Sequence, residues 1–189
     1  ALMFASHGVD VVGTDFNEEI VNTLNSGKTT FKEKNLDELY VAAQKAGIKF
    51  TTEYQKTDIY IITVPTPYDK FNKKIDASYV VEAVKSVIKV CLKGAIIVIE
   101  STISPGTIDK FVRPLVNEAN KDLNLVHAPE RIIPGNMVYE LLHNNRTIGA
   151  DDKIIGEKIK ALYSSFCKGQ IVVTDIRTAE MTKVVENTY

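Results

Sequence analysis

The stretch that decides the fold is IYIITVPTP, residues Ile59–Pro67. Its first part, Ile59–Val64, is a run dominated by apolar side chains, and such a run predicts a strand that is buried on both faces. Pro65 and Pro67 then end the strand, because proline lacks an amide N–H and favours an extended chain before it. Strands of this kind are typical of a parallel sheet that is covered by helices.

Similar runs recur on both sides of this stretch and alternate with segments of helical spacing. The predicted strands are Val9–Asp15, Ile59–Val64, Ala95–Ile99, Leu123–His127, Thr147–Ala150 and Ile171–Thr174. The predicted helices are Ala1–His7, Asn17–Ser26, Leu36–Ala46, Ala77–Leu92, Thr107–Asn120, Lys153–Phe166 and Thr178–Tyr189. This alternation predicts an α/β fold, Rossmann-like and doubly wound, with a mainly parallel sheet.

Composition and charge exclude several classes of protein. The 189 residues are 44% hydrophobic and 25% charged, and 23 basic against 24 acidic residues give a net charge of −1. This composition excludes a disordered chain and gives no sign of a nucleic-acid surface. The apolar runs are strand-sized, so we expect neither a membrane span nor a signal peptide. Cys91 and Cys167 lie far apart without metal-ligand spacing, which favours a reducing, cytoplasmic setting, although one disulfide would also account for two cysteines.

Polar and special residues gather directly after four of the predicted strands. They are Asp15, the segment Val64–Pro67, the pair Ser101-Thr102 and the pair Glu130-Arg131. In open α/β sheets, ligands bind outside the carboxyl ends of the strands. We therefore expect these residues to line one ligand-binding edge.

Asp15 has the position of an acid that binds the ribose hydroxyls of NAD at the end of a second strand. Such an acid normally follows a glycine-rich phosphate loop by about 20 residues. Only 14 residues precede Asp15, and none of them forms G-x-G-x-x-G. If Asp15 has this role, the first strand and its glycine loop lie before Ala1. On position alone, an ordinary surface acid is the commoner interpretation.

Hydroxyl groups follow two of the strands. Thr66 stands between two prolines, so it either faces a ligand across the strand ends or belongs to an ordinary strand stop. Ser101 and Thr102 precede a predicted helix start, which can hold an anion. Alternatively, they cap that helix.

Charged residues in two segments suggest acid–base chemistry. Glu130 could orient water or act as a base, and Arg131 could bind a phosphate or sugar oxygen. Alternatively, Glu130 and Arg131 belong to an ordinary surface ion pair. Lys183 and Asn187 are four residues apart and share a helical face. Together they could hold an oxyanion or a substrate hydroxyl, unless they belong to a solvated stripe.

Five motifs in this order resemble the nucleotide-sugar dehydrogenases that make UDP-uronic acids, the UDP-glucose/GDP-mannose dehydrogenase family. The motifs are FASHGVDVVGTDFN, VPTP, ESTISPGT, APERIIPGN and RTAEMTKVVENTY, and they extend from Phe4 to Tyr189. The forms PER-x-x-PG and RTAEMTK-x-x-EN look most like the UDP-N-acetyl-D-mannosamine dehydrogenase branch. Pro134 stands where UDP-glucose dehydrogenases typically carry a second Glu, which argues against glucose as the sugar.

The resemblance implies an NAD-dependent enzyme that oxidises the C6 alcohol of UDP-N-acetyl-D-mannosamine to a carboxylate in two steps. Two hydrides would pass to two successive NAD molecules, while a cysteine holds the carbon as a thiohemiacetal and then as a thioester. Neither Cys91 nor Cys167 stands in a matching context. That cysteine would therefore lie beyond Tyr189, and this chain alone would be inactive.

The resemblance also implies roles for individual residues and segments. The residues expected to bind NAD are Asp15, Val64, Pro65, Thr66, Ser101 and Thr102. The residues expected to act in catalysis are Glu130, Lys183 and Asn187, and those expected against the sugar nucleotide are Arg131, Ile132, Lys183 and Asn187. Residues 1–175 would form the NAD-binding domain, and 176–189 would begin a long central helix through which the enzyme forms a homodimer or a higher homo-oligomer.

Other functions stay open at this point. One is a UDP-glucose or other UDP-HexNAc 6-dehydrogenase, and another is a hydroxy-acid dehydrogenase of the 6-phosphogluconate type, against which VPTP and PER-x-x-PG argue. A third is a non-catalytic nucleotide-binding module. Substitution of Lys183 distinguishes an enzyme, which loses turnover but keeps NAD, from a sensor, which is indifferent.

Overall fold

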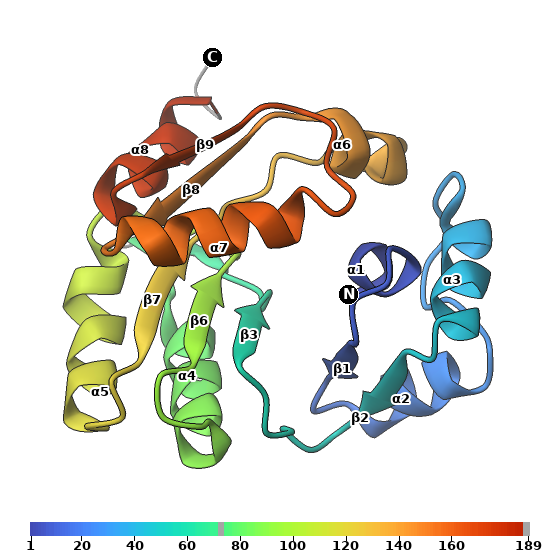
Figure 1. The fold of residues 1–189 in the computed structure, drawn as a ribbon, viewed down its shortest axis with the longest axis horizontal. Coiled ribbons are helices and arrows are strands. Elements are labelled where there is room, and N and C mark those ends of the chain that lie inside the picture. The colour runs from blue at the N-terminus through green and yellow to red at the C-terminus, as the bar shows by residue number, and fades with distance from the viewer. Residues whose placement is uncertain (72–73, 187–189) are drawn as a thin grey trace. The chain divides into compact units, whose positions relative to one another are not determined.

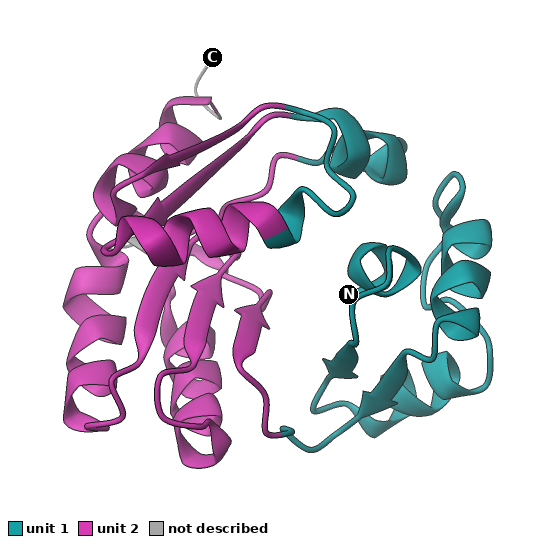
Figure 2. Cartoon of the chain, in the orientation of Figure 1, with its two compact units in different colours: residues 1–55, 132–144, 162–169 teal, residues 56–131, 145–161, 170–189 magenta. Residues whose placement is uncertain are grey.

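The structure is a computed structural model that describes residues 1–71 and 74–186 (Figure 1). The chain divides into two compact units (Figure 2). Unit 1 comprises residues 1–55, 132–144 and 162–169, and unit 2 comprises residues 56–131, 145–161 and 170–189. Both units combine strands with helices, so the predicted α/β class is confirmed.

Unit 2 is built on a five-stranded sheet with the order β3-β6-β7-β8-β9. Its strands are β3 (Ile59–Ile62), β6 (Ile96–Ile99), β7 (Asn124–His127), β8 (Arg146–Ala150) and β9 (Ile171–Thr174). All neighbouring strands pair in parallel except β7 and β8, which are antiparallel. The prediction of a mainly parallel sheet is confirmed. Because β8 is reversed, its first residue, Arg146, lies at the edge where β6 and β7 end.

The centre of this sheet is buried on both faces, as the apolar runs predict. All four residues of β6 are at most 2% exposed. The helices α4 (Ser78–Val90) and α5 (Arg113–Glu118) and the π-helical turn η1 (Ile108–Val112) contribute apolar side chains to the same core. The predicted helix over 107–120 is thus divided into η1 and α5, because Pro114 has no N–H to continue the regular hydrogen-bond ladder.

Two helices pack closely on the sheet of unit 2 through glycines. A Cβ on Gly156 of α7 (Lys153–Tyr163) would lie 2.5 Å from Val173 of β9. A Cβ on Gly149 of β8 would lie 2.7 Å from the Cβ of Ala179 in α8 (Ile176–Glu186). Asp175 begins α8, because its carboxylate accepts hydrogen bonds from the amide and hydroxyl of Thr178 at 2.9 and 2.6 Å.

Unit 1 is organised around a parallel pair of short strands. These are β1 (Val12–Thr14) and β2 (Lys49–Thr51), accompanied by α1 (Leu2–Ser6), α2 (Glu18–Asn25), α3 (Leu36–Lys45) and α6 (Met137–His143). Phe4 of α1 makes edge contacts with Tyr163 and Phe166, at ring centroid distances of 5.2 and 5.0 Å. These aromatic contacts bury the apolar segment with which the chain opens.

Several short elements are absent from the sequence-based prediction. They are β2, α6 and the hairpin of β4 (Tyr68–Asp69) and β5 (Lys74–Ile75). Each strand has only two or three residues, which is too short for a periodic pattern. Within the described ranges, no helix combines the length and the apolar character that a membrane crossing needs.

Candidate functional site

The residues that follow β3 and β6 are hydrogen-bonded to each other. The Ser101 hydroxyl donates to the Val64 carbonyl at 2.7 Å, and the Thr66 hydroxyl donates to the Thr102 carbonyl at 2.7 Å. Pro65 lies between the two bonded positions on the β3 side. The structure therefore brings all five predicted cofactor-binding residues of unit 2 together at the carboxyl edge of its sheet.

These bonds also limit what the hydroxyl groups can offer a ligand. Ser101 is only 8% exposed, and its proton is engaged with Val64. The Thr66 proton is engaged with Thr102, so the oxygen of Thr66 is left as an acceptor through its lone pairs. The residues after β3 and β6 are thus already held together by hydrogen bonds within the chain.

The helix start after Ser101 and Thr102 is occupied by a carboxylate of the chain itself. Glu180 is fully buried, and its two oxygens accept the amides of Gly106 at 2.6 Å and Ile108 at 3.0 Å. Thr107, the N-cap residue of η1, makes no side-chain cap. Neither Ser101 nor Thr102 caps η1, and these two amides are already satisfied by an acidic side chain.

Glu180 is not among the residues that the sequence predicts for this edge. A signal for it exists, because Ile176, Ala179, Glu180 and Lys183 follow the spacing of one helical face and all are buried. An acid at a core position of such a stripe needs a buried partner. The partner lies more than 70 residues earlier in the chain, at a sequence separation of 72 to Ile108 and 74 to Gly106.

Lys183 lies on the same buried face of α8. It is 8% exposed, and its side chain forms no hydrogen bond or ion pair with any residue of the described ranges. The alternative of a solvated stripe is therefore wrong for Lys183. Because a buried charged side chain usually has a partner, the ammonium of Lys183 is available to a ligand. Asn187 lies outside the described residues.

Glu130 and Arg131 follow the buried pair Ala128-Pro129 at the end of β7, and both are half-buried. The guanidinium of Arg131 forms an ion pair with Glu186 of α8 at 2.7 Å. This pair connects the loop after β7 to the helix that carries Lys183. Ile132 is half-buried and belongs to unit 1.

A buried ion pair lies at the same edge. Arg146 and Glu100 are 3.0 Å apart, and their side chains are only 6% and 13% exposed. Glu100 directly follows β6, and Arg146 begins β8. Local sequence pattern does not predict this pair, because 46 residues separate its members.

His127, at the end of β7, is fully buried, and its Nδ1 donates to the Ile99 carbonyl at 2.9 Å. Burial lowers the pKa of His127 to about 4, so the ring is neutral near pH 7. Because the carbonyl can only accept, Nε2 is the unprotonated nitrogen, and it has no hydrogen-bond partner in the described part of the chain.

Asp15 belongs to unit 1, where it follows β1. Its amide donates to the Thr51 carbonyl at 3.2 Å, and one carboxylate oxygen, Oδ1, accepts the Asn17 amide at 2.8 Å. The other oxygen, Oδ2, has no hydrogen-bond partner among the described residues. Asp15 thus offers a free acceptor at the carboxyl end of a parallel strand, which fits a ribose hydroxyl.

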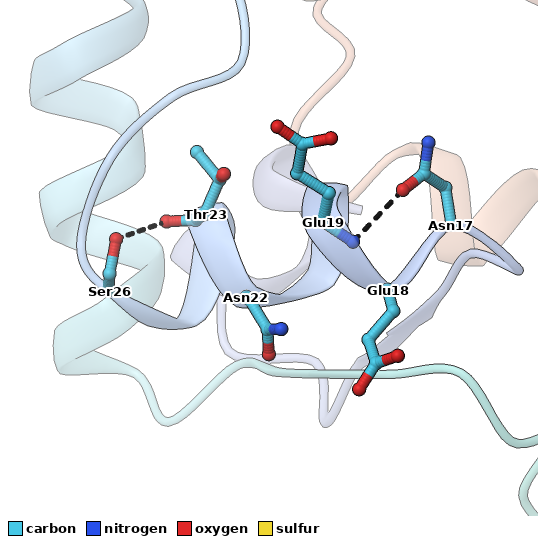
Figure 3. Close-up of a pocket in the computed structure, with 6 residues that line it drawn as sticks. All are labelled: Asn17, Glu18, Glu19, Asn22, Thr23 and Ser26. Atoms are coloured by element: carbon cyan, nitrogen blue, oxygen red, sulfur yellow. Dashed lines mark hydrogen bonds between the residues drawn. The ribbon is translucent and has the colours of Figure 1, made fainter.

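Unit 1 also contains an open hollow of about 650 Å³ along α2 (Figure 3). It is lined by Asn17, Glu18, Glu19, Asn22, Thr23 and Ser26. Glu18 and Glu19 are exposed carboxylates that point to different sides of the helix. No basic side chain lines the hollow, so it does not suit the phosphates of a dinucleotide. Across residues 1–71 and 74–186, no cluster of metal-ligating side chains is found.

Comparison with known proteins relates this geometry to a family. The model of the UDP-glucose/GDP-mannose dehydrogenase family, NAD binding domain, matches residues 1–167. The UDP-N-acetyl-D-mannosamine dehydrogenase of Methanococcus maripaludis is 42% identical over the whole chain, which covers 44% of that protein. The enzyme of the same name from Campylobacter jejuni is 35% identical, and 49% of it is covered. The chain thus spans about half the length of the curated relatives it matches.

Solved structures agree with these sequence matches. The native UDP-N-acetyl-mannosamine dehydrogenase Cap5O from Staphylococcus aureus has a TM-score of 0.93 at 42% identity, with 100% of this chain and 47% of that one covered. GDP-mannose dehydrogenase from Pseudomonas aeruginosa, at 23% identity, shares the fold with a TM-score of 0.91, with 100% of this chain and 46% of that one covered. The Rossmann-like fold and the resemblance of the five motifs are both confirmed. This chain belongs to the UDP-glucose/GDP-mannose dehydrogenase family, as a representative of its NAD-binding domain.

Proposed function

We propose that this chain acts within a protein of its relatives' length, which oxidises UDP-N-acetyl-D-mannosamine at C6 to UDP-N-acetyl-D-mannosaminuronate in two NAD-dependent steps. The observation that carries the proposal is the buried ammonium of Lys183, which has no side-chain partner among residues 1–71 and 74–186 and lies on a helix bonded to the carboxyl edge of the sheet. The relatives named UDP-N-acetyl-D-mannosamine dehydrogenase, at 35–42% identity, support the choice of sugar.

NAD, the cofactor of the family, fits the residues of the chain. The Asp15 carboxylate oxygen that has no hydrogen-bond partner in the described part of the chain would accept a ribose hydroxyl. At the carboxyl edge of unit 2, the bonded turn of Val64, Pro65 and Thr66 with Ser101 and Thr102 would border the cofactor. When bound, NAD supplies the hydride acceptor.

The other site residues would handle the sugar. Lys183 would act as the acid–base residue at the oxygen on C6, or its ammonium would stabilise negative charge on that oxygen, because no carboxylate of the described chain neutralises it. Glu130 would orient water for hydrolysis. Arg131 and Ile132 would lie against the sugar nucleotide, and Asn187 would hydrogen-bond the substrate.

We also propose an organisation for the whole protein. Residues 1–175 would form the NAD-binding domain, and 176–189 would begin a central helix. Met181 and Val185 of α8 are 50% and 47% exposed, which suits a homodimer or a higher homo-oligomer formed through this helix. Both cysteines are free and buried, which supports a cytoplasmic location and a nucleophilic cysteine elsewhere.

The test is an assay of NADH formation by the full-length protein with UDP-N-acetyl-D-mannosamine, UDP-N-acetyl-D-glucosamine and UDP-glucose. We expect rapid turnover with the mannosamine sugar and two NADH per sugar oxidised. Faster turnover of UDP-glucose or of another UDP-HexNAc would replace the proposed substrate. NAD binding without turnover of any sugar would favour the non-catalytic module.

A further inference from the structure

Glu180 is a fully buried acid whose carboxylate bonds to a distant loop. Its oxygens accept the amides of Gly106 and Ile108, at 2.6 and 3.0 Å, in the segment that joins β6 to η1. The same segment begins with Ser101 and Thr102, which are bonded to the turn after β3. One side chain of α8 is therefore bonded to the segment that also carries Ser101 and Thr102.

Glu180 and Lys183 are neighbours on one face of α8, because residues three apart in a helix lie on the same side. Opposite charges at this spacing usually pair on a helix. Here they do not, since both carboxylate oxygens of Glu180 are used by backbone amides and no ion pair joins Glu180 to Lys183. The ammonium of Lys183 stays available although a carboxylate is close in sequence.

We propose that Glu180 is a positioning residue for Lys183: its two hydrogen bonds fix α8 against the loop after β6 and keep its carboxylate from neutralising the ammonium. This inference rests on the proposed function of Lys183. The Arg131–Glu186 ion pair is a second connection, since it joins the next turn of α8 to the loop after β7. Between these two connections lies Lys183.

The two hydrogen bonds of Glu180 require a side chain with two acceptor oxygens. A carboxylate has two acceptor oxygens, whereas a glutamine side chain has one acceptor and an NH₂ group that would face the second backbone amide. Glu180→Gln therefore preserves the size of the side chain and breaks one of the two bonds. Displacement of a catalytic group by about 1 Å can lower a rate by about a hundredfold.

The experiment compares Glu180→Gln and Glu180→Ala with Asp175→Ala in the full-length protein. Asp175 caps the same helix through Thr178 but makes no bond to the loop after β6, so it is a matched control for loss of α8 stability. Initial rates are measured with UDP-N-acetyl-D-mannosamine and NAD, well below the melting temperature of each variant, and normalised to folded protein.

We expect Glu180→Gln to lower kcat by about tenfold or more with KM values for both substrates within about threefold, and Glu180→Ala to lower kcat further. Asp175→Ala should lower the melting temperature and keep kcat within about twofold. Equal kcat values for Glu180→Gln and wild type would overturn the proposal. So would an equal loss of kcat in Asp175→Ala, because the effect would then follow helix stability.

Amide hydrogen exchange gives a measurement that needs no turnover. In Glu180→Gln, protection should fall together in the segment around Gly106 and Ile108 and in the turn of α8 around Lys183. In Asp175→Ala it should fall only in the first turn of α8. If the wild type oxidises no UDP-sugar but this joint loss occurs, the proposed function fails and the coupling stands; if protection near Lys183 is unchanged, the coupling itself is refuted.

Discussion

The carboxyl edge of the sheet in unit 2 and the hollow along α2 in unit 1 both carry acidic side chains, but they differ in burial and bonding. At the sheet edge, Glu180 is fully buried with both oxygens bonded, and Lys183 is 8% exposed without a partner in the described chain. Along α2, Glu18 and Glu19 are exposed in the first helical turn, where the helix dipole favours acids. In this protein, the charged side chains of the candidate site are buried, whereas those along the hollow are exposed to solvent.

The largest expected effect follows from replacing Lys183. In the full-length protein, Lys183→Ala should lower kcat about a thousandfold, because acid–base groups typically contribute a factor of about 10²–10⁴. NAD binding, measured by titration calorimetry, should be unchanged, because the proposed role of Lys183 lies at the sugar. The matched variant is Glu18→Gln with Glu19→Gln, which should leave kcat within about twofold. A larger loss in the α2 variant than in Lys183→Ala would reverse the comparison.

A second test concerns the buried pair of Arg146 and Glu100, whose side chains are 6% and 13% exposed. Glu100→Gln should lower the free energy of unfolding by about 3–5 kcal/mol, because it removes the carboxylate that pairs with a buried guanidinium. The double variant Glu100→Leu/Arg146→Met should recover much of this loss. Urea denaturation measures both. A loss below about 1 kcal/mol for Glu100→Gln would show that the pair behaves like a surface ion pair.

The sequence predicts the fold better than it predicts the contacts of the site. A run such as Ile96–Ile99 determines burial on both faces by itself, so the central strands and the edge that they share follow from local pattern. Glu180 could not be assigned in this way, because its partners at Gly106 and Ile108 depend on how α8 packs on the sheet. The helix boundary differs for a similar reason, since Asp175 caps α8 and the helix begins at Ile176, two residues before the predicted start at Thr178.

The burial of His127 at the end of β7 predicts that the stability of the protein depends on pH. Its pKa falls from about 6.5 in the unfolded chain to about 4 in the folded protein, so the unfolded state binds more protons between these values. Stability is therefore lost as pH falls from about 6.5 to about 4, by about 3 kcal/mol in total. The difference in unfolding free energy between wild type and His127→Gln, measured in urea, should shrink by that amount over this range. A difference that is constant with pH would show that His127 is not buried in its neutral form.

The smallest expected effect concerns Arg131 and Glu186, whose side chains are about one-third exposed and form an ion pair at 2.7 Å. In the full-length protein, the Glu186 carboxylate should compete with the anionic sugar nucleotide for the guanidinium of Arg131. Exposed pairs contribute about 0.2–1 kcal/mol, so Glu186→Gln should lower the KM for the UDP-sugar by at most about fivefold and change stability by less than 1 kcal/mol.

Glu82→Gln is the control for this variant, because it breaks an exposed ion pair with Lys85 on α4 and should leave KM unchanged. Initial rates at low and high salt measure the effect, which salt should diminish because it screens exposed charges. A rise in KM in Glu186→Gln would mean that Glu186 holds Arg131 in its binding position. The Arg131–Glu186 pair would then act like the buried charges at the sheet edge, which fix the positions of other groups. The exposed fraction of a charged side chain would then no longer distinguish the charges of the sheet edge from those along α2.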